Sequence, residues 1–322
     1  MSDPIPGIHH VTAIATDAQQ NVDFYAGVLG LRLVKQTVNF DDPGTYHLYF
    51  GDGKGDPGTI LTFFPWNHVQ RGRRGTGQAT AISFAVPPES FGFWIERLTR
   101  YSVEYDKPQR RFDEPVLAFR DWDGLALELI GVPNAESKPA WETQGIGGKE
   151  AIRGFHSVTL CEDGMESTAA LLTDTMGAKK AKEEGAYFRY SFGEGVNASN
   201  VDLHCTPEFL TGVVAGGSVH HVAWRVPSDA AQVEWQTKVR EAGLNVTPVL
   251  DRQYFKSIYF REPGGVLFEI ATDPPGFARD EPENALGTML KLPPWLEKHR
   301  AEIEGELPKL HQPNFAADRQ LP

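Results

Sequence analysis

Residues 8–17 read IHHVTAIATD and residues 219–229 read VHHVAWRVPSD, so the chain repeats His-His-Val before an apolar run. A phrase that recurs at a long interval indicates an internal structural repeat. In both places a segment with apolar residues at helical spacing comes next, followed by three short runs of strand character. The phrase therefore predicts the start of a module, in which one strand precedes a helix and three further strands.

Four segments follow this plan, at residues 8–65, 80–132, 155–207 and 219–274. We expect the first strand after the helix at SVEYDK in the second module and at NVTPVLD in the fourth. One βαβββ module has an open sheet edge and cannot cover its own concave face, so the modules must pair. The predicted fold is α+β, with four βαβββ modules paired into two curved half-barrel units that each enclose a cavity.

Composition shifts divide the chain into candidate domains. Residues 134–150 are polar, contain Gly and Pro, and lack periodicity, which is typical of a linker. The predicted domains are residues 1–133, with modules one and two, and residues 151–273, with modules three and four. Residues 274–322 form a tail in which LPPWLEKHRAEIEGEL predicts a short helix.

Charge and cysteine content limit the partners and the compartment. Lys and Arg number 31 against 43 Asp and Glu, giving a net charge of −12, and no long basic run is present. Nucleic acid and anionic membranes are therefore not expected partners. Cys161 and Cys205 have no metal or redox spacing, and the chain has no leader-like or membrane-length apolar stretch. We expect a cytoplasmic protein, and leave open whether copies of it associate.

Comparing the modules position by position selects a candidate metal site. In the first strands, His10 and His221 occupy one position, where the second module has Ala81 and the third has Ser157. In the last strands, Glu269 matches Glu128, and the first module has Thr62 at that point. The third module is too irregular here to align.

Only modules one and four supply a complete ligand set, His10, His221 and Glu269. Two imidazoles and one carboxylate are the facial triad of non-heme Fe(II) sites, which leaves positions open for substrate and oxygen. A carboxylate within the apolar strand VLFEIAT is costly unless it is paired or bound to metal. Thr62 argues against the fourth ligand that a hydrolytic or isomerising metal site would use, and Glu128 lacks a matching histidine.

Longer phrases carry a family resemblance. FYAGVLGLRLV and the module plan resemble the vicinal oxygen chelate superfamily, which includes glyoxalases and extradiol dioxygenases. KQTVNFDDPGTYHLYFGD, GDPGTILTFFPW and DRQYFKSIYFREPGGVLFEIATD are similar to the hydroquinone and chlorohydroquinone ring-cleaving dioxygenases, over nearly the whole chain. The resemblance implies Fe(II), with Mn(II) as the alternative, held by His10, His221 and Glu269. It also implies a small aromatic substrate and O2.

The same resemblance gives catalytic roles around the metal to His9, Thr12, His220, Arg252 and Tyr259. Strand alternation alone predicts that His9 and His220 point away from the neighbouring ligand histidines, and that Thr12 shares the face of His10 and lines the cavity. For both histidines, a hydrogen bond to the backbone is the structural alternative to a role in proton transfer.

Two further residues have open structural questions. A two-residue turn in the last hairpin would place Ile258 opposite Glu269, whereas a three-residue loop at Pro263-Gly264-Gly265, with a bulge, would place Tyr259 there. Arg252 lies in a loop, where a surface ion pair is the alternative to a catalytic role. The remaining histidines recur in no common frame, and we interpret them as structural or surface residues: His47, His68, His204, His299 and His311.

The predicted function is an Fe(II)-dependent ring-cleaving dioxygenase that opens a para-diphenol with O2. A catechol extradiol dioxygenase with the same metal is one alternative, distinguished by a preference for ortho-diphenols. A glyoxalase-type metal lyase or isomerase is a second, weakened by Thr62. A protein that binds an aromatic compound without catalysis is the third, and it would bind no divalent metal.

Overall fold

The structure is a computed structural model that describes residues 4–143, 145–311 and 313. These residues form the four predicted βαβββ modules, and the α+β prediction is confirmed. Module one comprises β1 (Ile8–Ala15), α1 (Ala18–Val22) continued by the π-helical η1 (Asp23–Val28), β2 (Arg32–Asn39), β3 (Asp42–Gly51) and β4 (Ile60–Pro65). Module two comprises β5 (Gln78–Val86), α2 (Phe91–Arg100), β6 (Gln109–Arg111), β7 (Glu114–Arg120) and β8 (Ala126–Gly131).

The second half of the chain repeats this order. Module three comprises β9 (Phe155–Glu162), α3 (Glu166–Ala170) continued by the π-helical η4 (Leu171–Thr175), β10 (Lys179–Glu184), β11 (Tyr187–Phe192) and β12 (Ser199–Cys205). Module four comprises β13 (Ser218–Val226), α4 (Asp229–Glu241), β14 (Leu250–Asp251), β15 (Lys256–Arg261) and β16 (Leu267–Thr272). Short 3-10 turns are η2 (Pro88–Ser90), η3 (Ala135–Ser137), η5 (Gly195–Asn197), η6 (Phe277–Arg279), η7 (Glu283–Ala285) and η8 (Glu297–His299).

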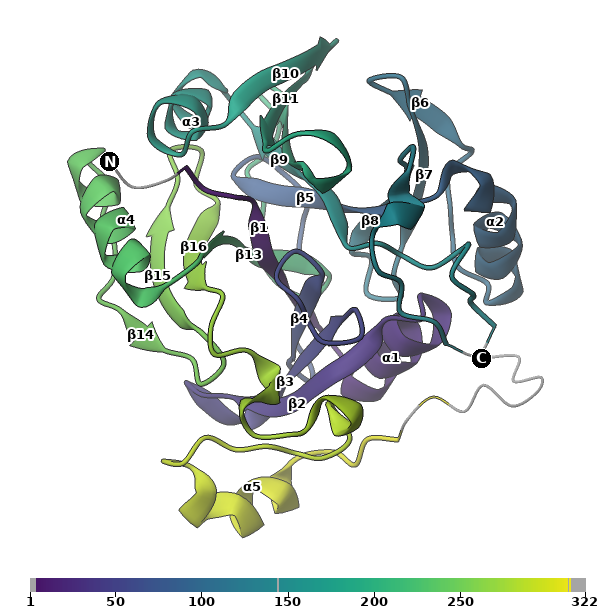
Figure 1. The fold of residues 1–322 in the computed structure, drawn as a ribbon, viewed down its shortest axis with the longest axis vertical. Coiled ribbons are helices and arrows are strands. Elements are labelled where there is room, and N and C mark those ends of the chain that lie inside the picture. Colours follow the sequence, from purple (N-terminus) through teal and green to yellow (C-terminus); the bar gives the residue numbers. More distant parts are fainter. Residues whose placement is uncertain (1–3, 144, 312, 314–322) are drawn as a thin grey trace.

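Two eight-stranded sheets account for all the strands of the described residues (Figure 1). The first has the order β14-β15-β16-β13-β1-β4-β3-β2, and the second has the order β10-β11-β12-β9-β5-β8-β7-β6. The first strands of paired modules meet antiparallel at the centre of each sheet, β1 with β13 and β5 with β9. The prediction of two paired half-barrels is confirmed.

The pairing joins modules across the expected linker. Module one shares a sheet with module four, and module two shares a sheet with module three. Each sheet therefore contains strands from both halves of the chain. The predicted domain division stays a prediction, with boundaries at residues 1–133, 134–150, 151–273 and 274–322. The two sheets do not correspond to these domains, because each sheet draws strands from both.

Two predicted strands are shorter than expected or displaced, and proline explains both. The strand expected at SVEYDK forms only an isolated bridge, Tyr105 to Phe119, and its ladder with β7 resumes as β6 after Pro108. The strand expected at NVTPVLD is reduced to β14, with an isolated bridge from Val246 to Phe260 on the other side of Pro248. Proline has no N–H to give to the ladder, so both strands are interrupted at sheet edges.

The longer helices cover the outer sides of the sheets. In Figure 1, α2 and α4 lie at opposite sides of the molecule. The Ser228 side chain caps α4 by accepting a hydrogen bond from the backbone N–H of Ala231, and Trp235 is buried beneath the helix. Of the helices that the described residues form, none is long and apolar enough to cross a membrane.

The tail crosses the outside of module one, where its helix α5 (Arg300–Glu306) lies beside β3 (Figure 1). Lys35 of β2 has no exposed side-chain surface and forms ion pairs with Asp280, at 2.6 Å, and with Glu281. Its ammonium also lies 4.9 Å from the centre of the Tyr254 ring. This buried cation ties the start of the tail to the first sheet.

Candidate metal centre

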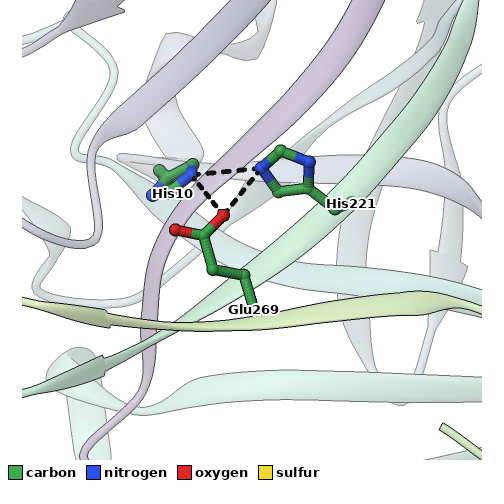
Figure 2. A group of neighbouring side chains, drawn as sticks. All are labelled: His10, His221 and Glu269. Atoms are coloured by element: carbon green, nitrogen blue, oxygen red, sulfur yellow. Dashed lines mark hydrogen bonds and ion pairs between the residues drawn. The ribbon is translucent and has the colours of Figure 1, made fainter. Parts of the chain in front are cut away.

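Three predicted ligands meet in the trough of the first sheet. His10 comes from β1, His221 from β13 and Glu269 from β16, and Figure 2 shows all three directed at one point. Oε2 of Glu269 lies 2.9 Å from Nε2 of His221 and 3.4 Å from Nε2 of His10, and the two Nε2 atoms are 3.3 Å apart. Two ligands about 2.1 Å from one ion are about 3.0 Å apart at a right angle and about 3.4 Å apart at a tetrahedral angle. The triangle fits a single small divalent cation.

The carboxylate of Glu269 is oriented for this role. Its Oε1 accepts a hydrogen bond from Ser257 at 2.5 Å, whereas buried Oε2 has no hydrogen-bond partner among the described residues. Burial acts to raise the pKa of Glu269, but His10 and His221 lower it well below its usual value. A buried, ionised oxygen that faces two imidazole nitrogens is a donor set suited to a cation.

Each ligand histidine is supported by the histidine before it. Nδ1 of His10 lies 2.9 Å from Nδ1 of His9, and Nδ1 of His221 lies 2.7 Å from Nδ1 of His220. With Nε2 directed at the metal position, each ligand carries its proton on Nδ1 and donates it to its neighbour. Such contacts fix the tautomer and the ring orientation of a metal ligand.

The prediction that His9 and His220 point away from the site fails in part because both lie in β-bulges. In the pairing of β1 with β13, the register skips one residue at His9 and one at His220. A bulge re-aims the side chains around it, so strict alternation does not hold there. His220 consequently borders the same cavity as His221, whereas His9 borders a second cavity that His10 does not line.

The register of the last hairpin places Tyr259 opposite Glu269, so of the two alternatives left open by the sequence the three-residue loop is the one that forms. The backbone N–H of Glu262 hydrogen-bonds to the carbonyl of Val266, which leaves Pro263, Gly264 and Gly265 as the loop. Gly265 has a φ of +109°, a conformation that favours glycine. The Tyr259 ring lies 5.7 Å from that of His221 and lines the cavity.

The fourth ligand point is occupied by Thr62, as the repeats predict. Thr62 pairs with Thr12 across β4 and β1, in the same relation that Glu269 has to β13. The two hydroxyls lie 2.8 Å apart, and Oγ1 of Thr62 lies 2.8 Å from Nε2 of His47. Thr12 is fully buried behind the cavity and does not line it, contrary to our prediction, because its hydroxyl is directed at Thr62.

The second sheet reproduces these positions without the histidines. Ser83 pairs with Glu128 and Thr159 pairs with Asp202, in the registers that place Glu269 and Thr62 in the first sheet. Ala81 and Ser157 occupy the two histidine positions. The third module, which could not be aligned by sequence, therefore contributes Asp202.

Two arginines fill this second trough. Arg111 donates two hydrogen bonds to Glu128, at 2.9 and 2.6 Å, and Arg189 donates two to Asp202, at 2.7 and 2.8 Å. Burial would raise the pKa of Glu128, but Arg111 lowers it. Each carboxylate thus has a guanidinium partner, and no second group of metal-ligating residues occurs among the described residues.

A cavity of about 260 Å³ opens in front of the triad. An apolar cavity of about 150 Å³ suffices for benzene, so this one has room for a single aromatic ring and a small second molecule. Its lining is largely aromatic, with a few polar groups. The lining residues are His10, Asn39, Phe40, Asp41, His47, Tyr49, Phe64, Trp66, His220, His221, Arg252, Phe255, Tyr259, Leu267 and Glu269.

Three of the predicted catalytic residues line this cavity, namely His220, Arg252 and Tyr259. Burial and the neighbouring His221 lower the pKa of His220 to about 3, so its imidazole is neutral. Burial and then Glu269 raise the pKa of Tyr259, which keeps the phenol protonated. Arg252 lies over the Tyr259 ring at 5.6 Å and pairs with Asp41 at 3.0 Å. Arg252 therefore borders the cavity and also forms the surface ion pair, and its catalytic role stays a prediction.

His47, interpreted from the sequence as a structural or surface residue, also lines the cavity. It is half-buried at the edge of the cavity, between the rings of Tyr49 at 4.1 Å and Phe64 at 4.3 Å, and its Nδ1 lies within hydrogen-bond distance of the Tyr49 hydroxyl, at 2.9 Å. The sequence did contain a signal for this position. His47 and Tyr49 alternate in TYHLYF, which puts them on one face of a strand, and that strand neighbours the one that carries Thr62. Phe255 could not be selected by comparing the modules, because its loop has no counterpart in the other three.

Comparisons with known proteins agree with this architecture. The family model of the Glyoxalase/Bleomycin resistance protein/Dioxygenase superfamily matches residues 7–129 and 154–270. The chain is 48% identical over 310 residues to MhqO of Bacillus subtilis (strain 168), a protein provisionally named as a ring-cleaving dioxygenase, covering 96% of this chain and 98% of that protein. It is 35% identical over 311 residues to the chlorohydroquinone/hydroquinone 1,2-dioxygenase of Sphingobium indicum, covering 94% and 96%.

Solved structures give the same result. A crystal structure of a provisionally named dioxygenase from Bacillus subtilis superimposes with a TM-score of 0.91 at 47% identity, covering 96% of this chain and 99% of that chain. Glyoxalase I from Zea mays superimposes with a TM-score of 0.62 at 14% identity, covering 83% and 92%. At that identity the likeness to the maize enzyme shows the fold alone.

Proposed function

The chain belongs to the Glyoxalase/Bleomycin resistance protein/Dioxygenase superfamily, and on that premise we propose that it is an Fe(II)-dependent ring-cleaving dioxygenase acting on a para-diphenol. The names of MhqO and of the Sphingobium enzyme support the reaction, and the latter supports hydroquinone and chlorohydroquinone as substrates. Mn(II) is the alternative metal for the same ligands.

The observation that carries the proposal is a three-ligand site with a non-ligating residue at the fourth point. His10, His221 and Glu269 would hold the metal, and Thr62 has its hydroxyl engaged by Thr12 and His47. Positions on the metal would then stay open toward an aromatic-lined cavity, as an oxygenase requires. A bound Fe(II) would supply the one-electron chemistry that lets O2 react with an aromatic ring.

The chain's own residues would bind and orient the diphenol. Nδ1 of His220 accepts the hydrogen bond of His221, so the neutral His220 ring carries its own proton on Nε2 and would donate it in a hydrogen bond to a substrate oxygen. Tyr259 is the other group that can exchange a hydrogen bond with that oxygen, as a donor because burial keeps it protonated. Arg252, held by Asp41, would balance the negative charge of a deprotonated substrate. His9 would hold the ring of His10, and Thr12 would hold the hydroxyl of Thr62.

The experiment is oxygen uptake by protein reconstituted anaerobically with Fe(II), given hydroquinone, methylhydroquinone, chlorohydroquinone and catechol in turn. We expect uptake with a para-diphenol, a ring-opened product, and no uptake by a Glu269→Ala variant. Removing Glu269 takes the only carboxylate from the triad, so bound metal should be lost together with activity.

Other outcomes lead to different functions. Preference for catechol would indicate an extradiol dioxygenase, and oxygen-independent activity with Zn²⁺ or Ni²⁺ on a thiohemiacetal would indicate a lyase or isomerase. A chain that binds a diphenol but no divalent metal would be a binding protein. A cytoplasmic location and self-association remain predictions, measured by cell fractionation and by sedimentation.

A further inference from the structure

A second cavity borders His9, the residue next to the ligand His10, and the proposed reaction does not use it. It has a volume of about 230 Å³ and is bordered by His9, by the charged groups Lys54, Asp56 and Asp273, and by Phe277. Its lining is therefore more polar than the aromatic wall of the first cavity. Such a space is large enough for several waters, each of which takes about 30 Å³ in the liquid.

Phe255 is the one described residue that lines both cavities. Its side chain is 3% exposed, and its ring lies 4.9 Å from that of His10 and 5.1 Å from that of His9. The two histidines face different cavities, and the Phe255 ring packs against both of them. The aromatic ring is thus part of the wall of both cavities, in contact with His9 and with the ligand His10.

The loop that bears Phe255 is fixed by the start of the tail. The backbone N–H of Arg252 donates to the carbonyl of Phe255 at 2.9 Å, which closes the loop on itself. Outside the loop, the N–H of Gly276 donates to the carbonyl of Tyr254 at 2.9 Å, and the Tyr254 hydroxyl donates to Asp280 at 2.9 Å. The Phe255 loop is therefore held in place by a segment outside the repeated modules.

We propose that Phe255 is a partition that keeps the water of the second cavity away from the metal ligands and the bound substrate. It is a positioning residue and takes no part in bond making. Water at the ligands would compete for the metal and would weaken every electrostatic interaction in the site, because the local dielectric would rise. The apolar shell around a metal site controls solvent access in this way.

The test measures metal release, which needs no substrate. Protein loaded with Mn²⁺ is mixed with excess chelator, and the release rate is compared for the unaltered chain, Phe255→Ala, Phe255→Leu and Phe277→Ala. Phe277 is the matched control, since it is also 3% exposed and lines the second cavity but not the first. Its removal enlarges the second cavity and leaves the partition in place. Thermal unfolding of each variant measures any general loosening.

We expect Phe255→Ala to release metal about 10- to 100-fold faster, the range typical of changes around metal ligands. Phe255→Leu keeps an apolar side chain at the partition and should stay near the original rate, as should Phe277→Ala. Equal acceleration by Phe255→Ala and Phe277→Ala, or none in either, would overturn the partition while metal binding stands. The inference rests on the proposed metal centre, so an unaltered chain that binds no Mn²⁺ or Fe²⁺ would overturn both.

Discussion

Replacing Arg111 in the second trough should show how much its ion pair with Glu128 contributes to the free energy of unfolding. Arg111→Met keeps most of the side-chain length and removes the charge. Glu128, which is 6% exposed, would then keep only the hydrogen bond from Ser83 at 2.7 Å. It would lose two hydrogen bonds from a guanidinium, at 2.9 and 2.6 Å, each worth about 1.5–3 kcal/mol. We therefore expect the free energy of unfolding to fall by about 3–5 kcal/mol, as for other buried ion pairs that lose one partner.

The effect should depend on pH in a defined direction. Burial acts to raise the pKa of Glu128, and Arg111 is the main group that lowers it. Without Arg111 the folded-state pKa would lie above the unfolded value of about 4.3, so stability would be lost as the pH rises through that range toward neutrality. The difference between the variant and the unaltered chain should consequently be largest near pH 7 and shrink near pH 4.

Urea unfolding at pH 4, 5.5 and 7 measures both expectations, with circular dichroism as the probe. The double variant Arg111→Met with Glu128→Leu provides the control, because replacing a whole buried ion pair by apolar residues is often neutral. It should recover most of the lost stability. A loss below about 1 kcal/mol at pH 7 is typical of exposed ion pairs and would refute the reasoning. So would a double variant as unstable as the single one.

Two further predictions concern other carboxylates. Burial and Glu262 raise the pKa of Glu162 to about 8, and neither carboxylate oxygen of Glu162 has a hydrogen-bond partner among the described residues. Because its folded pKa lies above the unfolded value, stability is lost as the pH rises from about 4.5 to 8. Glu162→Gln should therefore add about 2 kcal/mol to the free energy of unfolding at pH 9 and little at pH 5. Urea unfolding at the two pH values measures the difference. Thr62→Glu would place a carboxylate at the fourth ligand point, so metal competition assays should show tighter binding while oxygen uptake is lost. Thr62→Val, which removes only the hydroxyl, should keep metal affinity, and equal behaviour of the two variants would contradict a role for the fourth point.

The metal centre could be predicted because the repeats make positions comparable. Four strand registers place Thr62, Glu128, Asp202 and Glu269 at one point of the module. Aligning the sequences of modules one, two and four was enough to identify this position. For Tyr259 the sequence left two hairpin registers open, and the structure has the bulged three-residue loop that the doubled glycine allows.

What sequence reasoning missed lies outside the repeats or depends on long-range packing. Phe255 and its tether to the tail have no counterpart in other modules, so no comparison could select them. His47 was passed over for the same reason, although it fixes Thr62. The sheets join module one to four, and two to three, because first strands pair antiparallel at the centre of each sheet. Nothing in a single module specifies which other module supplies that partner.

The bulges explain why a second histidine precedes each ligand histidine in the sequence. In all four first strands the pairing register skips the residue before the ligand position: His9 and His220 in one sheet, Thr80 and His156 in the other. The bulge is therefore a property of the module, present whether or not a ligand follows. It turns the skipped residue toward its neighbour, and a histidine there meets Nδ1 of the ligand histidine at 2.9 or 2.7 Å. The second sheet has the bulges but Ala81 and Ser157 at the ligand positions, so its carboxylates are matched by arginines where the first sheet would use a metal ion.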